Sequence, residues 1–180
     1  TFLAGPETIN VKPLREGALE GAPKNEVVAF WKEVSEMQRA IGALSASLQE
    51  AFKTLTLMES SLKNASFEPG ALDAELHALR MELIEIRTEL NGSSSKNEVG
   101  EKNPPDIRTR VSLVALGTAN STYGPTQTHR ESLDIAAEEF VVIKNELEQL
   151  QNREIPQMLQ RLSDAGAPWI EGMPIPDKQD

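Results

Sequence analysis

Two histidines, His77 and His129, are the residues of this sequence best suited to acid–base or metal chemistry. Asp73 precedes His77 by four residues, so in a helix both side chains would share one face and could offer two metal ligands. A zinc site needs three or four protein ligands, and the sequence has no cysteine and no third histidine to complete the set. We therefore interpret Asp73 and His77 as a helix-surface pair, and His129, two residues before Glu131, as part of a helix cap.

Pairs of carboxylates are the other candidates for chemistry, because glycosidases use two acids that flank a sugar in a cleft. The neighbouring acids Glu138 and Glu139, or Glu82 and Glu85, instead have the spacing of solvated residues on an amphipathic helix. The sequence also lacks a phosphate-binding glycine loop, a nucleophile elbow and a His–Glu metal helix. It therefore predicts no catalytic, cofactor-binding or metal-binding residues, and no cofactor.

The composition is that of a soluble globular domain with an aliphatic core. The chain has 180 residues, of which 39% are apolar and only 4% aromatic. Its net charge of −10 and pI of about 4.8 argue against nucleic acid and anionic lipid as partners, since both are bound through clustered Lys and Arg. No apolar run approaches the roughly 18 to 20 residues that span a bilayer, so we expect no membrane insertion.

The longest apolar pattern predicts a helix over residues 26–64. Its spacing alternates between three and four residues for five heptads, which keeps one apolar seam facing a partner. We predict Asn25 as the N-cap, because its side chain can accept a hydrogen bond from a first-turn amide. The seam consists of Val27, Phe30, Val34, Met37, Ile41, Leu44, Leu48, Ala51, Leu55, Met58 and Leu62.

A second seam predicts a helix over residues 69–91. Pro69 fits a first helical turn, and Gly92 fits the left-handed conformation that closes a helix. The residues after it, 92–104, have one apolar side chain in thirteen, which predicts a mobile loop. The second seam consists of Leu72, Leu76, Leu79, Leu83, Ile86 and Leu90.

Two further helices are predicted after this loop. Ile107, Val111 and Val114 indicate a short third helix, which Gly117 weakens. The fourth, over residues 125–165, begins either with Pro125 in its first turn or with a capping box from Thr128 to Glu131. Its seam comprises Leu133, Ala136, Phe140, Ile143, Leu147 and Leu150, and then Ile155, Leu159 and Leu162.

The predicted fourth helix, over residues 125–165, should contain an interruption and have a defined end. Pro156 lacks a backbone donor, and the apolar phase changes between Leu150 and Ile155, so we expect a kink near Asn152. Gly166 should end the helix, and the proline-rich tail, 167–180, should be extended.

The first residues differ in kind from the rest. Residues 8–11 alternate polar and apolar side chains as a strand does, yet one strand cannot be stable alone. The sequence begins with Thr1 rather than Met, which suggests a processed product or a piece of a longer protein. We therefore expect the remainder of the sheet to lie in protein outside this sequence.

Five short segments have sequences similar to segments of one known family, and they occur in the same order along the chain. They are Ala4–Pro13, Leu90–Gly92, Pro105–Val111, Gly124–Thr128 and Leu162–Trp169. Together they resemble the last strand and the helical C-terminal region of secreted proteins built on sortilin-like (VPS10-type) BNR-repeat β-propellers, commonly labelled glycosyl hydrolases. The sequence departs from that family's usual Asp-Pro-Arg-like junction at Lys12–Arg15.

The resemblance implies that this helical region follows a β-propeller in a longer protein, and it implies no catalytic activity for the helical region itself. No Asp-box of the Ser-x-Asp-x-Gly-x-Thr-Trp type is present, so the propeller and its active site would lie outside these residues. The implied partners are an N-terminal β-propeller and β-sandwich of the same parent chain, and another protein is a further candidate. The implied location is secreted, periplasmic or at the cell surface.

The expected architecture is an all-α, antiparallel up-down bundle of two long and two short helices, with one N-terminal strand remnant. Residues 1–22 would form the strand and linker, residues 23–166 the bundle, and residues 167–180 the extended tail. Four side-by-side helices and three columns, with helices two and three stacked end to end, both fit the helix lengths. We favour the side-by-side arrangement.

Three functional hypotheses remain, of which the first is what the resemblance implies. The first is a non-catalytic accessory domain of a secreted propeller protein, which stabilises its parent or mediates protein contacts. The second is a stand-alone coiled-coil adaptor or oligomerisation module. The third, an enzyme in its own right, is the weakest because the polar residues offer so little chemistry. In either of the first two roles, the excess of acids favours a basic or polar protein partner.

Overall fold

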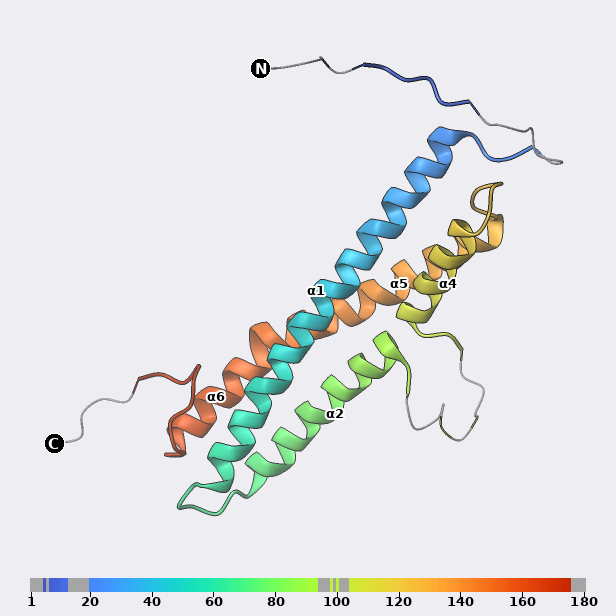
Figure 1. The fold of residues 1–180 in the computed structure, drawn as a ribbon. Helices are drawn as coiled ribbons and strands as arrows, with labels where there is room; N and C mark the ends of the chain where they lie inside the picture. The colour runs from blue at the N-terminus through green and yellow to red at the C-terminus, as the bar shows by residue number, and fades with distance from the viewer. Residues whose placement is uncertain are drawn as a thin grey trace.

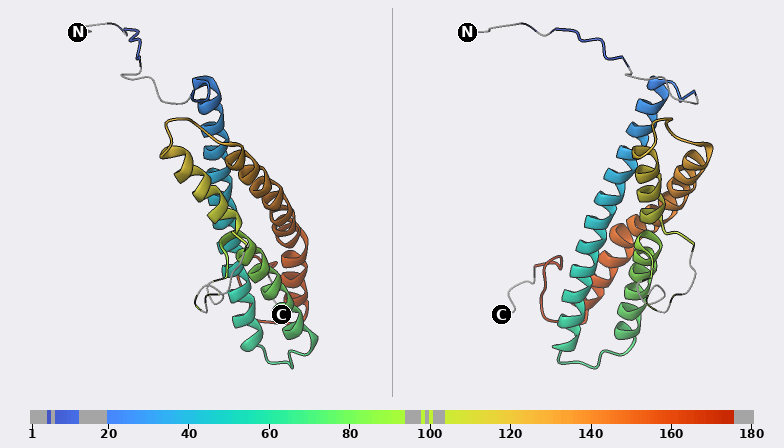
Figure 2. Two further views of the ribbon diagram at one scale, coloured as in Figure 1. Left: turned by 90° about the vertical axis from the view of Figure 1, so that its right-hand side faces the viewer. Right: turned by 45° about the vertical axis from the view of Figure 1, so that its right-hand side comes forward.

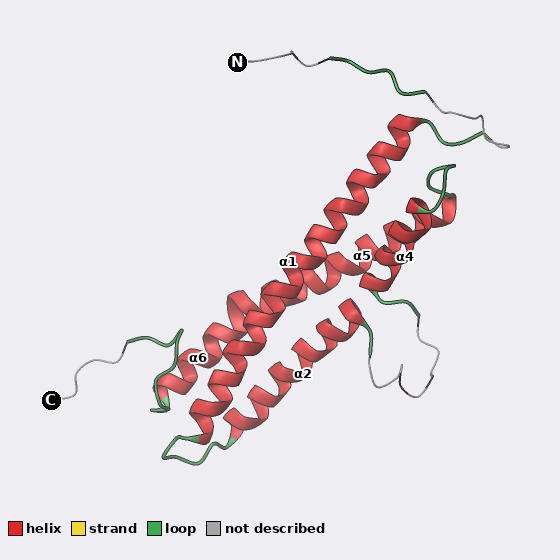
Figure 3. Ribbon diagram, viewed as in Figure 1, coloured by secondary structure: helices red, strands yellow, loops and turns green. Residues whose placement is uncertain are grey.

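The computed structural model describes residues 5, 7–12, 20–93, 98, 100 and 104–175. Its regular structure is helical throughout the described ranges, which confirms the all-α fold class (Figure 3). Residues 7–12 form no strand there, and Ile9 and Val11 are exposed, so the strand remnant stays a prediction. The elements are α1 (Lys24–Lys63), α2 (Ala71–Asn91), α4 (Ile107–Ala119), α5 (Gln127–Gln149), the π-helical turn η1 (Leu150–Glu154) and α6 (Ile155–Asp164).

The helices form three columns, so the side-by-side arrangement that we favoured is wrong. Helix α1 is the first column, α2 and α4 stack end to end as the second, and α5, η1 and α6 run on as the third (Figures 1 and 2). Since α2 and α4 have 21 and 13 residues against 40 in α1, each covers only part of its length. The second column runs antiparallel to the other two.

Arg108 fixes the junction at which the short helices meet. It lies in the first turn of α4, and its guanidinium donates to Asn91 Oδ1 at the end of α2 over 2.7 Å. A second guanidinium nitrogen donates to Ser45 Oγ, in the middle of α1, also over 2.7 Å. One side chain therefore links both short helices to the first column.

The predicted seams form a single aliphatic core. Val27, Met37, Leu72 and Phe140 are only half-buried, whereas the other seam residues of all four predicted helices are buried. Leu55 in α1, Leu90 in α2 and Ile143 in α5 are all 0% exposed, so the core lies between the three columns. Burial of these side chains is the main term that holds the columns together.

Several predicted helix starts are wrong by one or two residues. Helix α1 begins at Lys24, so Asn25 lies inside its first turn rather than at the N-cap, and the carbonyl of Pro23 accepts from the amides there. Helix α2 begins at Ala71, after Gly70 rather than around Pro69. Gly92 does close α2 with a φ of 79°, as expected.

The predicted disturbance in the fourth helix is a π-helical turn. Residues Leu150–Glu154 form η1, which is centred on the predicted position, Asn152. The wider turn accommodates one extra residue before Pro156, so Leu150 and Ile155 both face the core despite being five residues apart. The phase change is thus confirmed, and the π-turn is its cause.

The chain folds back after α6 instead of extending away. Gly166 has a φ of 78°, and the amide of Ala167 donates to the carbonyl of Leu162 over 3.0 Å, as in a Schellman motif. Pro168 then accepts a hydrogen bond of 2.5 Å from the hydroxyl of Ser61 in α1. A turn follows, and Met173 is buried against the bundle, whereas Ile175 after it is exposed.

Candidate functional site

The structure places Asp73 and His77 on the exposed side of α2, as the sequence predicts. Both line an open hollow of about 790 Å³ beside the turn that joins α1 to α2. Within the described ranges, no group of three His, Asp or Glu side chains is arranged to hold a metal ion. Both side chains are exposed at the surface of α2.

His129 is a capping residue, at the start of α5. Its Nδ1 accepts from the amide of Thr126 over 3.2 Å, and the hydroxyl of Thr126 accepts from the amide of His129 over 3.3 Å. Thr126 is thus the N-cap, and both starts predicted for this helix, with Pro125 or with Thr128 and Glu131, are wrong. The imidazole ring also packs on α4, where Gly117 leaves room for it.

A tight turn explains why the N-cap falls at Thr126. Gly124 is buried with a φ of 86°, and a Cβ there would lie 2.9 Å from side-chain atoms of both Ala22 and Val27. The amide of Ala22 also donates to the carbonyl of Tyr123 over 2.8 Å. These contacts come from residues about a hundred positions earlier, so local sequence carries no sign of them.

The acids of the two predicted pairs lie in different surroundings. Glu139 lies 3.4 Å from the guanidinium of Arg110 on α4, whereas its neighbour Glu138 is exposed on α5. Glu82 and Glu85 lie on α2 near the third column.

Glutamates of α2 and the third column instead form an acidic seam. Partial burial is the main cause that raises the pKa of Glu82, and the charges of Glu154, Glu85 and Glu146 raise it further. Partial burial likewise raises the pKa of Glu89, with the charges of Glu146, Glu85 and Glu139. This seam is invisible in the sequence, because its members come from separate helices.

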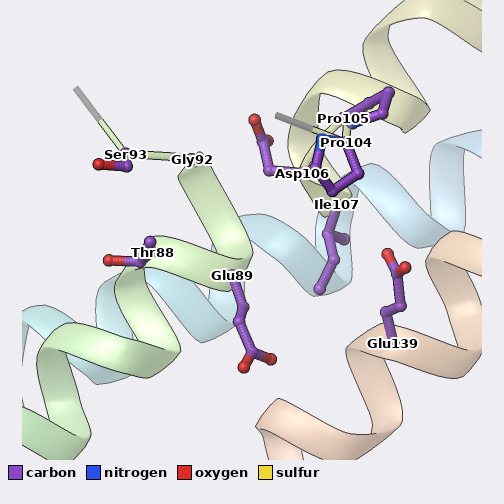
Figure 4. A pocket seen from close by; sticks show the side chains of 9 residues that line it. All are labelled: Thr88, Glu89, Gly92, Ser93, Pro104, Pro105, Asp106, Ile107 and Glu139. Carbon is purple, nitrogen blue, oxygen red and sulfur yellow. The ribbon is translucent and has the colours of Figure 1, made fainter. Parts of the chain in front are cut away.

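A cavity of about 350 Å³ lies where α2 and α4 meet (Figure 4). Its apolar wall is Pro104, Pro105 and Ile107, and the carboxylates of Glu89, Asp106 and Glu139 surround it. Asp106 caps α4 by accepting from the amide of Thr109 over 2.9 Å, and Glu139 pairs with Arg110. Two of the three acids therefore have structural partners.

Exposed apolar residues on α4 and α5 are the feature that sequence reasoning missed. Leu113 lies one turn after Arg110, and Ile135 lies one turn before Glu139. The Arg110–Glu139 ion pair sets the register of the two antiparallel helices, so Leu113 and Ile135 lie at the same level. We name Leu113, Leu116, Ile135 and Val142 the α4–α5 apolar face. The sequence did contain one sign of this face: the four residues are apolar but do not belong to the predicted seams.

No protein-family model, curated protein or solved structure matches this chain. None of the described helices is long and apolar enough to cross a membrane. The family hypothesis rests on the sequence resemblance of five short segments alone. Where they are described, four of them lie at helix ends: the end of α2, the start of α4, the start of α5, and the end of α6 with its tail.

Proposed function

We propose that this chain is a non-catalytic accessory domain of a secreted BNR-repeat β-propeller protein of the glycosyl-hydrolase type. In this role the helical bundle stabilises or extends its parent, and the parent's propeller and β-sandwich are its first partners. The sequence resemblance motivates the family. The support from the structure is the way in which the columns are locked together along their length.

One observation carries the structural role: α1 and the third column are cross-linked at both ends and in the middle. Arg130 lies 3.4 Å from Glu26, and Ser47 donates to Gln151 over 2.9 Å, in both cases across 104 residues of chain. At the far end, Ser61 binds the carbonyl of Pro168. These contacts hold two parallel columns in one register.

The result is a stiff rod. At about 1.5 Å per residue, the 40 residues of α1 span about 60 Å. Residues 20–22 lie at one end of the rod, and residues 167–175 lie at the other (Figure 1). Protein attached at the two ends would be held about that distance apart, which suits a spacer or a supporting domain.

The complete coding region tests the family assignment directly. We expect β-propeller repeats with Asp-boxes upstream of the codon for Thr1. A parent protein from which residues 23–166 are deleted should keep its propeller chemistry but unfold at a lower temperature. A coding region without such repeats would refute the assignment, and an unchanged melting temperature would refute the stabilising role.

A further inference from the structure

The α4–α5 apolar face is exposed although the helices that carry it are well packed. Leu113, Leu116 and Val142 have more than half of their surface exposed, at 57%, 61% and 54%, and Ile135 has 41%. Single exposed apolar residues are common on proteins, but neighbouring ones on two helices form a patch of the kind that marks binding sites.

The face is preformed on a rigid platform. Beneath it, Arg110 and Glu139 pair across the two helices, and His129 joins the start of α5 to α4. Leu116 continues the face one turn along α4 from Leu113, and Val142 continues it two turns along α5 from Ile135. The elongated apolar stripe is therefore already in place, and a ligand that binds it would not have to order these helices.

The charge beside this stripe is negative. Glu131, Asp134 and Glu138 follow one another at helical spacing on α5, and all three are exposed. None of the three forms an ion pair with another described residue. Three bases on these two helices form ion pairs with other acids: Arg110 with Glu139, Arg130 with Glu26, and Lys144 with Glu148.

We infer that the α4–α5 apolar face is a docking site for an amphipathic helix of another protein, whose apolar stripe is flanked by lysine or arginine. Apolar side chains of the partner would cover Leu113 and Ile135, and its bases would face Glu131, Asp134 and Glu138. A second copy of this chain would bring the same acids and a net charge of −10, so repulsion opposes self-association. This role does not depend on the proposed parent protein, because the α4–α5 apolar face lies along the side of the bundle and not at its ends.

A synthetic peptide tests the inference on the full chain. The probe is a fluorescent helical peptide with leucines at i, i+3, i+4 and i+7, flanked by lysines, and the matched peptide carries glutamate in place of each lysine. We expect the lysine peptide to bind with a dissociation constant of about 10 μM or tighter. Binding should weaken as salt is raised, and the glutamate peptide should not bind.

Two variants separate the apolar and charged contributions. Leu113→Ser combined with Ile135→Ser should weaken binding at least about tenfold. Glu131→Gln, Asp134→Asn and Glu138→Gln together should weaken it and remove most of its salt dependence. Val28→Ser and Met81→Ser are the matched controls, because both residues are exposed apolar positions on other helices, α1 and α2, at 69% and 42%. Circular dichroism should show that every variant stays folded.

Three outcomes would overturn the inference. The first is no binding of the lysine peptide at about 100 μM. The second is equal loss of affinity in the Leu113/Ile135 variant and in the Val28/Met81 control. The third is a dimer in analytical ultracentrifugation that the Leu113/Ile135 substitutions dissociate, since a second copy would then be the occupant.

Discussion

Gly117 in α4 provides the space that the imidazole of His129 fills. A Cβ built on Gly117 would lie 2.6 Å from His129 Nε2 and 3.2 Å from Cε1, both closer than van der Waals contact allows. The same ring accepts a hydrogen bond from the amide of Thr126 at the start of α5. The glycine that weakens α4 locally therefore allows the ring that caps the next helix to pack closely.

This contact predicts that Gly117→Ala has opposite effects in two backgrounds. In the natural protein, crowding of His129 should outweigh the better helix propensity of alanine and lower the free energy of unfolding by about 1 kcal/mol. In a His129→Ala background, the same change should raise it by about 1 kcal/mol, since only the propensity gain remains. Urea unfolding of the four proteins measures both values. Equal effects in the two backgrounds would contradict the contact.

Leu48 should be a major contributor to stability, because it is only 3% exposed in the middle of α1. Leu48→Ala should lower the free energy of unfolding by about 2 to 5 kcal/mol through lost burial and a new cavity. Lys53→Ala is the control: its exposed ammonium lies 3.6 Å from Glu50, a contact that contributes little. Similar melting shifts for the two variants would show that the core is assigned wrongly.

The acidic seam predicts that mild acidification stabilises the bundle through Glu82 and Glu89. Both pKa values are raised above the ordinary 4.5, so the folded state holds these protons more tightly than the unfolded state does. The stabilisation is therefore fully present below pH 4.5 and is lost as pH rises through the raised pKa values. Glu82→Gln with Glu89→Gln should raise stability at pH 7 and reduce its change between pH 7 and 5.

Glu138→Gln serves as the control for this experiment, because Glu138 is exposed on α5 and is not among the charges that act on the seam. Denaturant unfolding at both pH values gives the comparison. If the double variant and this control show the same pH dependence, the seam does not govern the response.

The chain by itself should turn over no aryl glycoside. Glu138 and Glu139 are adjacent on one helix, and Glu139 is held by Arg110, whereas a glycosidase needs carboxylates about 5 to 10 Å apart across a bound sugar. Release of nitrophenol from a panel of aryl glycosides checks this expectation. Turnover that is abolished by Glu138→Gln with Glu139→Gln would overturn the non-catalytic proposal.

The sequence predicted the helices and their buried faces because both depend on local spacing. Each buried residue of α1 from Phe30 to Leu62, except Ser61, lies on the predicted seam. The helix starts were less predictable, since the N-cap at Thr126 depends on Gly124 packing against Ala22 and Val27. Spacing patterns do not report contacts between residues so far apart.

Helix lengths alone could not decide between three columns and four helices. The decisive contacts are those of Arg108 with Asn91 and Ser45, which place α4 beyond the end of α2. The α4–α5 apolar face was missed for a related reason. Leu113 and Ile135 lie off the regular seams, and only the register of two packed helices shows that they are neighbours.

The π-turn gives the third column a tolerance to change in chain length that α1 lacks. Loss of one residue from Leu150–Glu154, such as Asn152, would bring Leu150 and Ile155 to an ordinary four-residue spacing, and a continuous α-helix could form if Pro156 were also replaced, because proline does not fit a helix interior. Both halves of the column would still face the core. The same deletion within α1 would rotate everything beyond it by about 100°, turning Leu55 and Met58 away from their neighbours. Sequences of this fold that lack a proline at position 156 can therefore be one residue shorter at the π-turn, but not along α1.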